Sequence, residues 1–405
     1  MVGTESFWRS NAVKLSRIFS IFAAVCLVTG CNDDMQTAAS VAESLRLVEE
    51  QEKVIVLTWE EYFSPEVVAE FEQETGIKVE FVYFENLEEM RSLLQSRPGG
   101  IDVLVCDGAG LADLIELQLL QRVQPDLITN FANLDSMYLN LMSDPGNEFS
   151  VPYMWGTTLI AYRSDLIQEP EQSWASLMDQ KYKGKVLILD DTFDSYAAAL
   201  LSLGFDINSE DPDELGKALD LLLDHVNKNE ARFDDIINIR EKLLSGECWM
   251  GMTYSSDAAV LAEENEHISY FIPNEGAALW LDSFAIARES PNSVGAHRFI
   301  DFICRGDVAG RNSNDLWCAS ANKAAHAYLS TEILAEKTLY PDPETLRKCR
   351  FATKAGATRN RLVNQGMKLI YDRLAQNTMK SSNDALASES SEKEDEISAD
   401  LPVAP

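Results

Sequence analysis

Val54-Ile-Val-Leu-Thr-Trp59-Glu-Glu61-Tyr62-Phe-Ser64-Pro65-Glu66 is the stretch that decides the fold of this 405-residue chain. Its four consecutive apolar residues, 54–57, predict a short strand that is covered on both faces. Ser64 is a residue type that favours the N-cap of a helix, and Pro65 is favoured at the first helical position. The negative charge of Glu66 interacts favourably with the positive end of the helix dipole. The stretch therefore predicts a strand followed directly by a helix.

The residues that follow extend this pair to a β-α-β unit. Gly76 is placed to end the helix, because glycine readily adopts the left-handed conformation found there. The segment 77–83 alternates apolar with more polar residues and predicts a second strand. The polar turn 59–62 then lies at the carboxyl end of the first strand, which is where open α/β sheets bind ligands.

Short apolar runs alternate with helical stretches along the rest of the chain, which predicts an α/β fold. Further strands are expected at 103–106, 153–162, 185–189, 249–254 and 279–286. Further helices are expected at 87–95, 111–120, 214–225 and 233–244. The aromatic strand 153–162, which contains Gly156, is interpreted as a segment that crosses between two parts of the fold.

Composition and charge limit the classes of partner. The chain is 46% apolar and 9% aromatic, which is typical of a globular protein. Its formal net charge of −32 argues against nucleic acid, because that binding depends on Lys and Arg neutralising phosphates. Acidity favours cationic partners, although solubility alone also explains a negative net charge.

The cysteines and histidines give no sign of a metal site. Outside the N-terminal region, five cysteines show no metal-binding spacing and the four histidines are scattered: Cys106, Cys248, Cys304, Cys318, Cys349, His225, His267, His297 and His326. We therefore expect no metal and no cofactor. The odd number of cysteines leaves one or two disulfides possible.

The first thirty residues predict a secretion signal. Three basic residues precede the apolar run 18–28, which is too short to span a bilayer. The segment ends in Leu27-Val-Thr-Gly-Cys31, which resembles the bacterial lipobox, in which the cysteine is acylated and becomes the new N-terminus. Several acyl chains on Cys31 would hold the protein on a membrane, with 31–52 as a tether. An ordinary signal peptide with a chance cysteine is the alternative.

The C-terminal end differs in composition from the rest. Residues 377–405 are rich in Ser, Glu, Asp and Ala and contain few apolar residues that could be buried. Because such a segment cannot offset the entropy of ordering its chain, we expect an acidic disordered tail.

Acidic residues recur beside aromatic residues at the ends of predicted strands. They are Glu61 between Trp59 and Tyr62, Asp191 and Asp194 near Phe193, Asp257 after Tyr254, and Asp282 after Trp280. Each alone could be a helix cap or a solvated acid, and Asp191 lies where an N-cap is expected. Together, carboxylates and rings along a cleft would suit a linear organic polycation and repel an anion.

From residue 54 to about residue 374, the sequence resembles the spermidine/putrescine-binding proteins of polyamine ABC transporters. The resemblance rests on segments 57–62, 71–79, 102–105, 150–156, 173–174, 181–184, 189–191, 280–283 and 338–342. It implies a two-lobed periplasmic-binding-protein fold, type II-like, that closes by a hinge around a ligand in the cleft between the lobes. The expected lobes are 53–156 plus 276–320, and 157–275 plus 321–376.

The resemblance also implies a set of ligand-binding residues. They are Trp59, Glu61, Tyr62, Asp107, Asp191, Asp194, Tyr254, Asp257, Trp280 and Asp282. Of these, Asp282 is the strongest candidate for a salt bridge to an ammonium group. The chain departs from the family at Asp107 and Ala109, where the family has a serine and then a tyrosine, so that a charge is gained and a ring lost.

The function that the resemblance implies is that of a monomeric lipoprotein that binds a polyamine in the periplasm and delivers it to an inner-membrane ABC permease. This function involves no nucleic-acid partner and no catalysis. The sequence leaves open which membrane the lipid would be inserted in. Alternatives are a cation or amine sensor, a binder of another small ligand in the same fold, and a secreted hydrolase that uses Asp191 and Asp194.

Overall fold

β1 (Lys53–Thr58), α3 (Pro65–Thr75) and β2 (Lys78–Tyr83) form the predicted β-α-β unit. The two strands pair in parallel, with Val54 opposite Val79. Ser64 caps α3 by accepting a hydrogen bond from the Val67 N–H, and Gly76 ends the helix with a φ of 74°. The capping residues read from the sequence are therefore confirmed.

The structure, a computed structural model, describes residues 52–399, and side chains up to residue 379. The predicted signal peptide, Cys31 and nearly all of the predicted tether lie outside these residues. None of the helices within the described range is long and apolar enough to cross a membrane.

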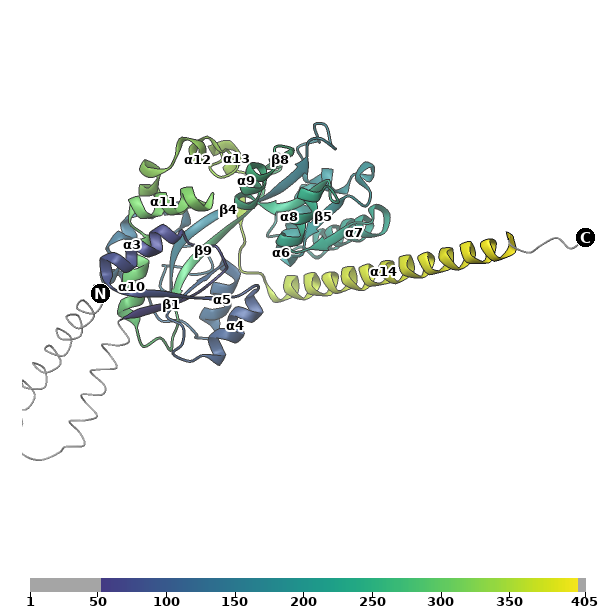
Figure 1. Cartoon of the computed structure of the whole chain (residues 1–405). Coiled ribbons are helices and arrows are strands. Elements are labelled where there is room, and N and C mark those ends of the chain that lie inside the picture. Colours follow the sequence, from purple (N-terminus) through teal and green to yellow (C-terminus); the bar gives the residue numbers. More distant parts are fainter. Residues whose placement is uncertain (1–51, 400–405) are drawn as a thin grey trace, which may run out of the picture. The chain divides into compact units, whose positions relative to one another are not determined.

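The described strands form one sheet in the order β2-β1-β3-β9-β4-β7-β5-β6, with β8 and β10 paired to β4 and β11 paired to β9 (Figure 1). The other strands are β3 (Val103–Cys106), β4 (Ser150–Arg163), β5 (Val186–Leu189), β6 (Arg232–Asp234), β7 (Met250–Tyr254), β8 (Ile268–Phe271), β9 (Ala278–Ile286), β10 (Ala319–Ser320) and β11 (Arg350–Phe351). The other α-helices are α4 (Leu87–Ser96), α5 (Gly108–Glu116), α6 (Thr192–Ser202), α7 (Pro212–Asn229), α8 (Ile236–Ser245), α9 (Ser255–Glu264), α10 (Ser293–Ile303), α11 (Gly306–Leu316), α12 (Thr331–Ala335), α13 (Pro343–Leu346) and α14 (Ala357–Ala399).

Two long strands connect two groups of parallel strands. The first strand group is β1, β2 and β3, and the second is β5, β6 and β7. The segment 150–157 of β4 pairs with β9, whereas 158–163 pairs with β7 and β8. β9 pairs with β3 on its other side, so that β4 and β9 run side by side from one strand group to the other (Figure 1).

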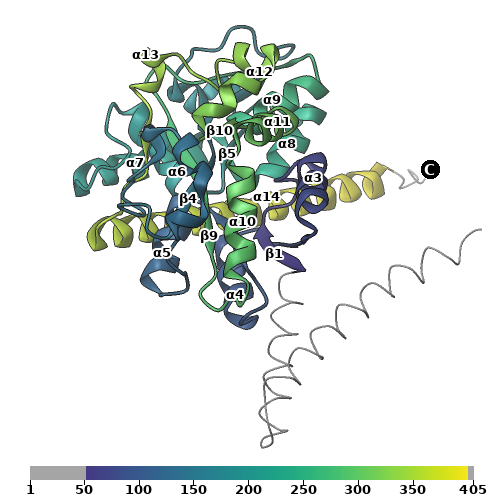
Figure 2. The same ribbon diagram turned by 90° about the vertical axis from the view of Figure 1, so that its left-hand side faces the viewer.

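Each strand group has its own core. In the first, Val54 and Val56 cluster with residues of α3 and α10, whereas Leu57 and Leu104 cluster with residues of α4 and α5. The four helices surround this strand group (Figures 1 and 2). This double cover explains the continuous apolar run at 54–57. In the second, buried residues of β5 and β7 form a separate cluster with Trp155 and Trp174.

Several details differ from the expectations. The helix expected from residue 233 begins at Ile236, because Asp235 caps it and the residues before it pair with β5 as β6. Helix α14 packs Val363, Met367 and Ile370 against α6 and α7 and continues to Ala399, through most of the tail expected to be disordered. A segment with few apolar residues can still be helical when it contains good helix formers such as Ala, Glu and Lys. The five described cysteines are all free and buried, so none of the possible disulfides forms among them.

Candidate ligand-binding site

Asp282 lies near the middle of β9 and is only 8% exposed. Trp280, two residues earlier, is on the same face of the strand, because side chains alternate along a strand. The Tyr62 hydroxyl, from the turn after β1, donates a hydrogen bond of 2.5 Å to Asp282 Oδ2. Burial raises the pKa of Asp282 to about 7, although the Tyr62 hydrogen bond acts to lower it.

Asp107 follows β3, the neighbour of β9 in the sheet. The two strands are antiparallel and pair Cys106 with Ser283, which brings Asp107 next to Asp282. Asp107 is also the N-cap of α5, since its Oδ1 accepts a hydrogen bond of 2.7 Å from the Gly110 N–H. Burial, together with the negative charge of Asp191, raises the pKa of Asp107 to about 6.

Asp191 and Asp194 lie at the start of α6, directly after β5 of the second strand group. Asp191 caps α6 by accepting a 2.8 Å hydrogen bond from the Asp194 N–H, which confirms the predicted N-cap. Asp194 accepts from the Thr158 hydroxyl at 2.7 Å and from the Tyr254 hydroxyl at 3.3 Å. Burial raises the pKa of both acids, to about 7 for Asp194, where the charge of Asp191 adds to the effect.

Aromatic rings adjoin these carboxylates from both strand groups. Tyr254 meets Trp280 edge to face with 6.1 Å between ring centroids, and Trp59 meets Tyr62 in the same way at 5.6 Å. A Cβ on Gly156 would lie 2.3 Å from Trp280 Cζ2, so glycine is required for the indole to rest against β4. The rings are therefore positioned to stack against methylene groups and cations.

Two predicted residues are placed differently from the rest. Glu61 is exposed in the turn after β1 with a φ of 55°, and the structure gives it no hydrogen bond or ion pair with the other predicted residues. Asp257 lies in the first turn of α9, close enough to Tyr254 that its charge contributes to raising the pKa of that hydroxyl. The pKa of Asp257 itself is raised by burial, with Arg240 acting in the opposite direction.

The carboxylates of the site share one property. Among the ion pairs of the described side chains, none involves the five acids Asp107, Asp191, Asp194, Asp257 and Asp282. Nor does the described part of the chain contain a group of three or more His, Cys, Asp or Glu residues that could hold a metal ion. The arrangement can therefore bind a ligand that brings its own positive charges.

Sequence reasoning missed the residues that support the site from β4. Tyr153 donates a 2.8 Å hydrogen bond to the Tyr62 carbonyl, and Asn312 Nδ2 donates one of 2.7 Å to the Tyr153 hydroxyl. Thr158 on the same strand holds Asp194. Only the aromatic content of 153–162 indicated that this strand matters, since its partners are distant in the sequence.

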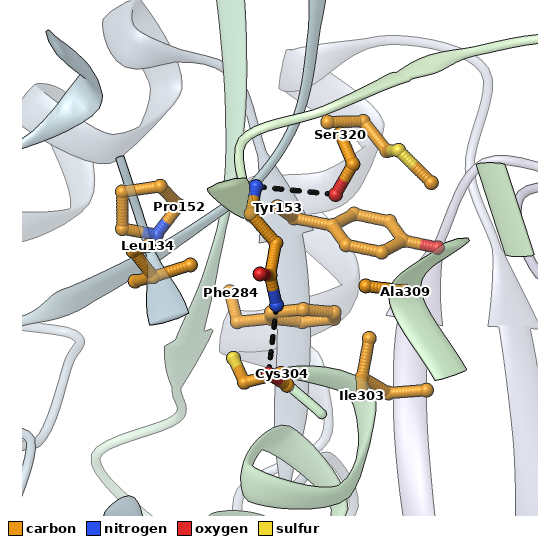
Figure 3. A pocket seen from close by; sticks show the side chains of 10 residues that line it. Leu134, Pro152, Tyr153, Phe284, Ile303, Cys304, Ala309 and Ser320 are labelled. Atoms are coloured by element: carbon orange, nitrogen blue, oxygen red, sulfur yellow. Dashed lines mark hydrogen bonds between the residues drawn. The ribbon is translucent and has the colours of Figure 1, made fainter. Parts of the chain in front are cut away.

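A small cavity of about 10 Å³ lies elsewhere, within the core of the first strand group (Figure 3). Its lining is neutral and consists of Leu134, Pro152, Tyr153, Met154, Phe284, Ile303, Cys304, Ala309, Ser320 and Asn322. Asn322 Nδ2 donates to the Cys304 carbonyl at 2.7 Å, and its N–H donates to Ser320 Oγ at 3.2 Å. The cavity is large enough for about one water molecule and does not suit an organic ligand.

Comparisons with known proteins agree with this arrangement. A family model described as bacterial extracellular solute-binding protein matches residues 66–338. The spermidine/putrescine-binding periplasmic protein of Escherichia coli is 34% identical over 302 residues, which are 74% of this chain and 86% of that protein. The putrescine-binding periplasmic protein PotF of the same bacterium is 31% identical over 327 residues, 76% of this chain and 88% of that protein.

A solved structure is similar over most of its length. The spermidine/putrescine ABC transporter substrate-binding protein of Streptococcus pneumoniae matches with a TM-score of 0.73 at 26% identity, over 80% of this chain and 99% of that one. The resemblance noted in the sequence is thus confirmed at the level of the family and of the fold.

Proposed function

This chain belongs to the family of bacterial extracellular solute-binding proteins and has their mixed α/β periplasmic-binding-protein fold, and from this premise we propose that it binds a polyamine of the spermidine or putrescine kind. The family consists of binding proteins, so the alternative of a hydrolase based on Asp191 and Asp194 is set aside. The two relatives from Escherichia coli are a spermidine/putrescine-binding protein and a putrescine-binding protein, which supports the choice of ligand.

The observation that carries the proposal is a set of buried and partly buried carboxylates that form no ion pair with a described Lys or Arg. Asp282 and Asp107 adjoin the first strand group, and Asp191 and Asp194 follow β5 of the second. Unpaired buried charges are costly, so a ligand that neutralises several of them at once gains affinity from each. The methylene segments between the ammonium groups of a polyamine would pack against Trp280, Tyr254 and Tyr62.

Binding would be coupled to closure of two lobes, which we assign to 53–156 plus 276–320 and to 157–275 plus 321–376. The continuous strand β4 is suited to act as the connection, because it pairs with β9 beside the first strand group and with β7 of the second. Closing the lobes over several carboxylates without a cation would be costly, so closure would follow binding. The closed form would then be presented to an ABC permease in the inner membrane.

The protein would act outside the cytoplasm while anchored to a membrane through lipid on Cys31. This part of the proposal rests on the apolar run 18–28 and on the lipobox-like segment 27–31. Replacing Cys31 with Ser should release the protein from the membrane fraction and abolish labelling with radioactive palmitate. Membrane association that persists in this variant would contradict the anchor.

The ligand is tested by isothermal titration calorimetry on the chain from residue 32 onward, with spermidine, putrescine and the anion citrate at moderate salt. We expect heat and a rise in melting temperature with the amines, since a ligand bound only by the folded state stabilises that state. No response to any amine would overturn the proposal.

A second experiment distinguishes transport from sensing, because a sensor would bind the same amine. Deletion of the gene would lower amine uptake if the protein is a transport component, and would leave uptake unchanged if it is a sensor.

A further inference from the structure

Asp107 adjoins both groups of carboxylates in the site. On one side, the pairing of Cys106 with Ser283 places it at the end of β3 next to Asp282. On the other, its charge acts on Asp194 and the charge of Asp191 acts on it. The charge of Asp107 therefore interacts with Asp282 on β9 and with Asp191 and Asp194, which follow β5 of the second strand group.

The charge balance of the site follows from this position. Asp107, Asp191, Asp194 and Asp282 are brought together without an ion pair to any described Lys or Arg. When all four carboxylates are ionised, a diamine, which carries two positive charges, leaves two of them uncompensated. A triamine supplies one charge more on an inner ammonium group, and Asp107 interacts both with Asp282 and with Asp191.

We propose that Asp107 is the specificity-determining residue that makes the site prefer a triamine or longer polyamine, by pairing with an inner ammonium group, over a diamine of the same length. This inference rests on the proposed function. It follows from the position of the carboxylate relative to Asp282, Asp191 and Asp194, and from the lack of a protein cation to neutralise the four.

The capping role of Asp107 is compatible with this function. One hydrogen bond from the Gly110 N–H occupies Oδ1, and a carboxylate offers about four acceptor positions in total. An ammonium group can therefore bind without disrupting α5. Asparagine is as good an N-cap as aspartate, so Asp107→Asn removes the charge while retaining the cap.

The test compares spermidine with 1,8-diaminooctane, which separates its terminal ammonium groups by a chain of equal length but lacks the inner one. Affinities are measured by calorimetry on the full chain in detergent, at neutral pH and constant salt. The matched control is Asp113→Asn, which removes the same charge from an exposed position of the same helix. The wild type should bind spermidine at least about tenfold more tightly than the diamine.

In Asp107→Asn, this preference should fall about tenfold or more, because spermidine loses a charge-assisted hydrogen bond while the diamine loses none. Asp113→Asn should retain the wild-type preference. If Asp107→Asn weakens both ligands equally, or neither, the inference is wrong while the polyamine function stands. If the wild type binds neither spermidine nor any other amine, the proposed function itself fails.

Discussion

The acids of the candidate site and the acids of the surface are the same residue types in opposite electrostatic environments. On the surface, Asp165 pairs with Arg163 at 2.7 Å, and Glu72 pairs with Lys78 at 2.5 Å. These partners lower the pKa of both acids. In the site, Asp194 and Asp282 are buried without a cation, and their pKa values are raised to about 7.

The difference shows that net charge is a poor guide to function here. The chain has 66 acidic and 34 basic residues, so nearly half of the acids cannot have a Lys or Arg partner of their own. An unpaired acid on the surface is solvated and costs little, whereas the same residue in the site is desolvated. The feature that indicates a cationic ligand is therefore the burial of acids that form no ion pair with a Lys or Arg of the chain.

The largest effect is expected from Asp282→Asn. The amide can still accept the hydrogen bond from the Tyr62 hydroxyl, but it cannot pair with an ammonium group. Affinity for spermidine should fall by about 1.5–3 kcal/mol, or roughly 10- to 150-fold in Kd. The free energy of unfolding without ligand should not decrease, because a desolvated charge is removed. Calorimetry and urea denaturation measure the two quantities, and an unchanged Kd would place the ammonium site elsewhere.

The dependence of stability on pH should separate the two classes of acid. Asp194 titrates near pH 4 when unfolded and at about pH 7 when folded. Between these values the folded protein holds more protons, so this carboxyl makes the free energy of unfolding fall as pH rises, by up to about 1.4 kcal/mol per pH unit. The surface acids act in the opposite direction, and their contribution is lost only as pH falls towards their lowered pKa values.

The variant Asp194→Asn isolates this effect from His225, whose pKa is lowered to about 4 by burial and whose contribution has the opposite sign. Urea denaturation of both proteins at a series of pH values gives the difference directly. The variant should be the more stable at neutral pH, and its advantage should disappear towards about pH 4. Parallel curves would mean that Asp194 is solvated in the protein without ligand.

A smaller effect is expected from Tyr62→Phe. The variant loses the hydrogen bond that positions Asp282 and lowers its pKa. Spermidine affinity should fall by about 0.5–1.5 kcal/mol, or roughly 2- to 10-fold in Kd, and should weaken further under mildly acidic conditions. The control is Tyr83→Phe, since Tyr83 is an exposed tyrosine on β2. Equal losses in the two variants would contradict a specific role of Tyr62.

The smallest effect is expected at the surface, in Glu80→Gln. Glu80 pairs with Lys53 at 2.9 Å, and both side chains are about half exposed. Exposed pairs contribute less than about 1 kcal/mol, so unfolding should change slightly and spermidine affinity not at all. A change in Kd comparable to that of Asp282→Asn would mean that the amine responds to overall charge, and the contrast between site and surface acids would be lost.

Local signals were sufficient for the first β-α-β unit. Ser64, Pro65 and Gly76 act within a few residues of their own position, and the structure places each where the sequence predicted. The strand Val103–Cys106 was predicted with its observed bounds. The beginning of α8 was not, because β6 exists only through its pairing with β5.

For the candidate site, too, some features could be predicted from the sequence and others depend on the tertiary structure. Residue type and the resemblance to polyamine-binding proteins indicated which acids and rings to examine, but not which of them are buried or in contact. Asp107 meets Asp282 only because β3 and β9 are neighbours, and Asp194 meets Thr158 only because β4 continues into the second strand group. Glu61 has the same local pattern as the others and is exposed.

The sequence by itself therefore determined the α/β class, the capping of the first helix and the chemical type of the site, since these depend on residues near one another in the chain. The tertiary structure alone decided which acids lose their water and remain without a cation. Desolvation and charge pairing depend on distances between residues as far apart in the sequence as Tyr62 and Asp282, and only the sheet order brings such residues together.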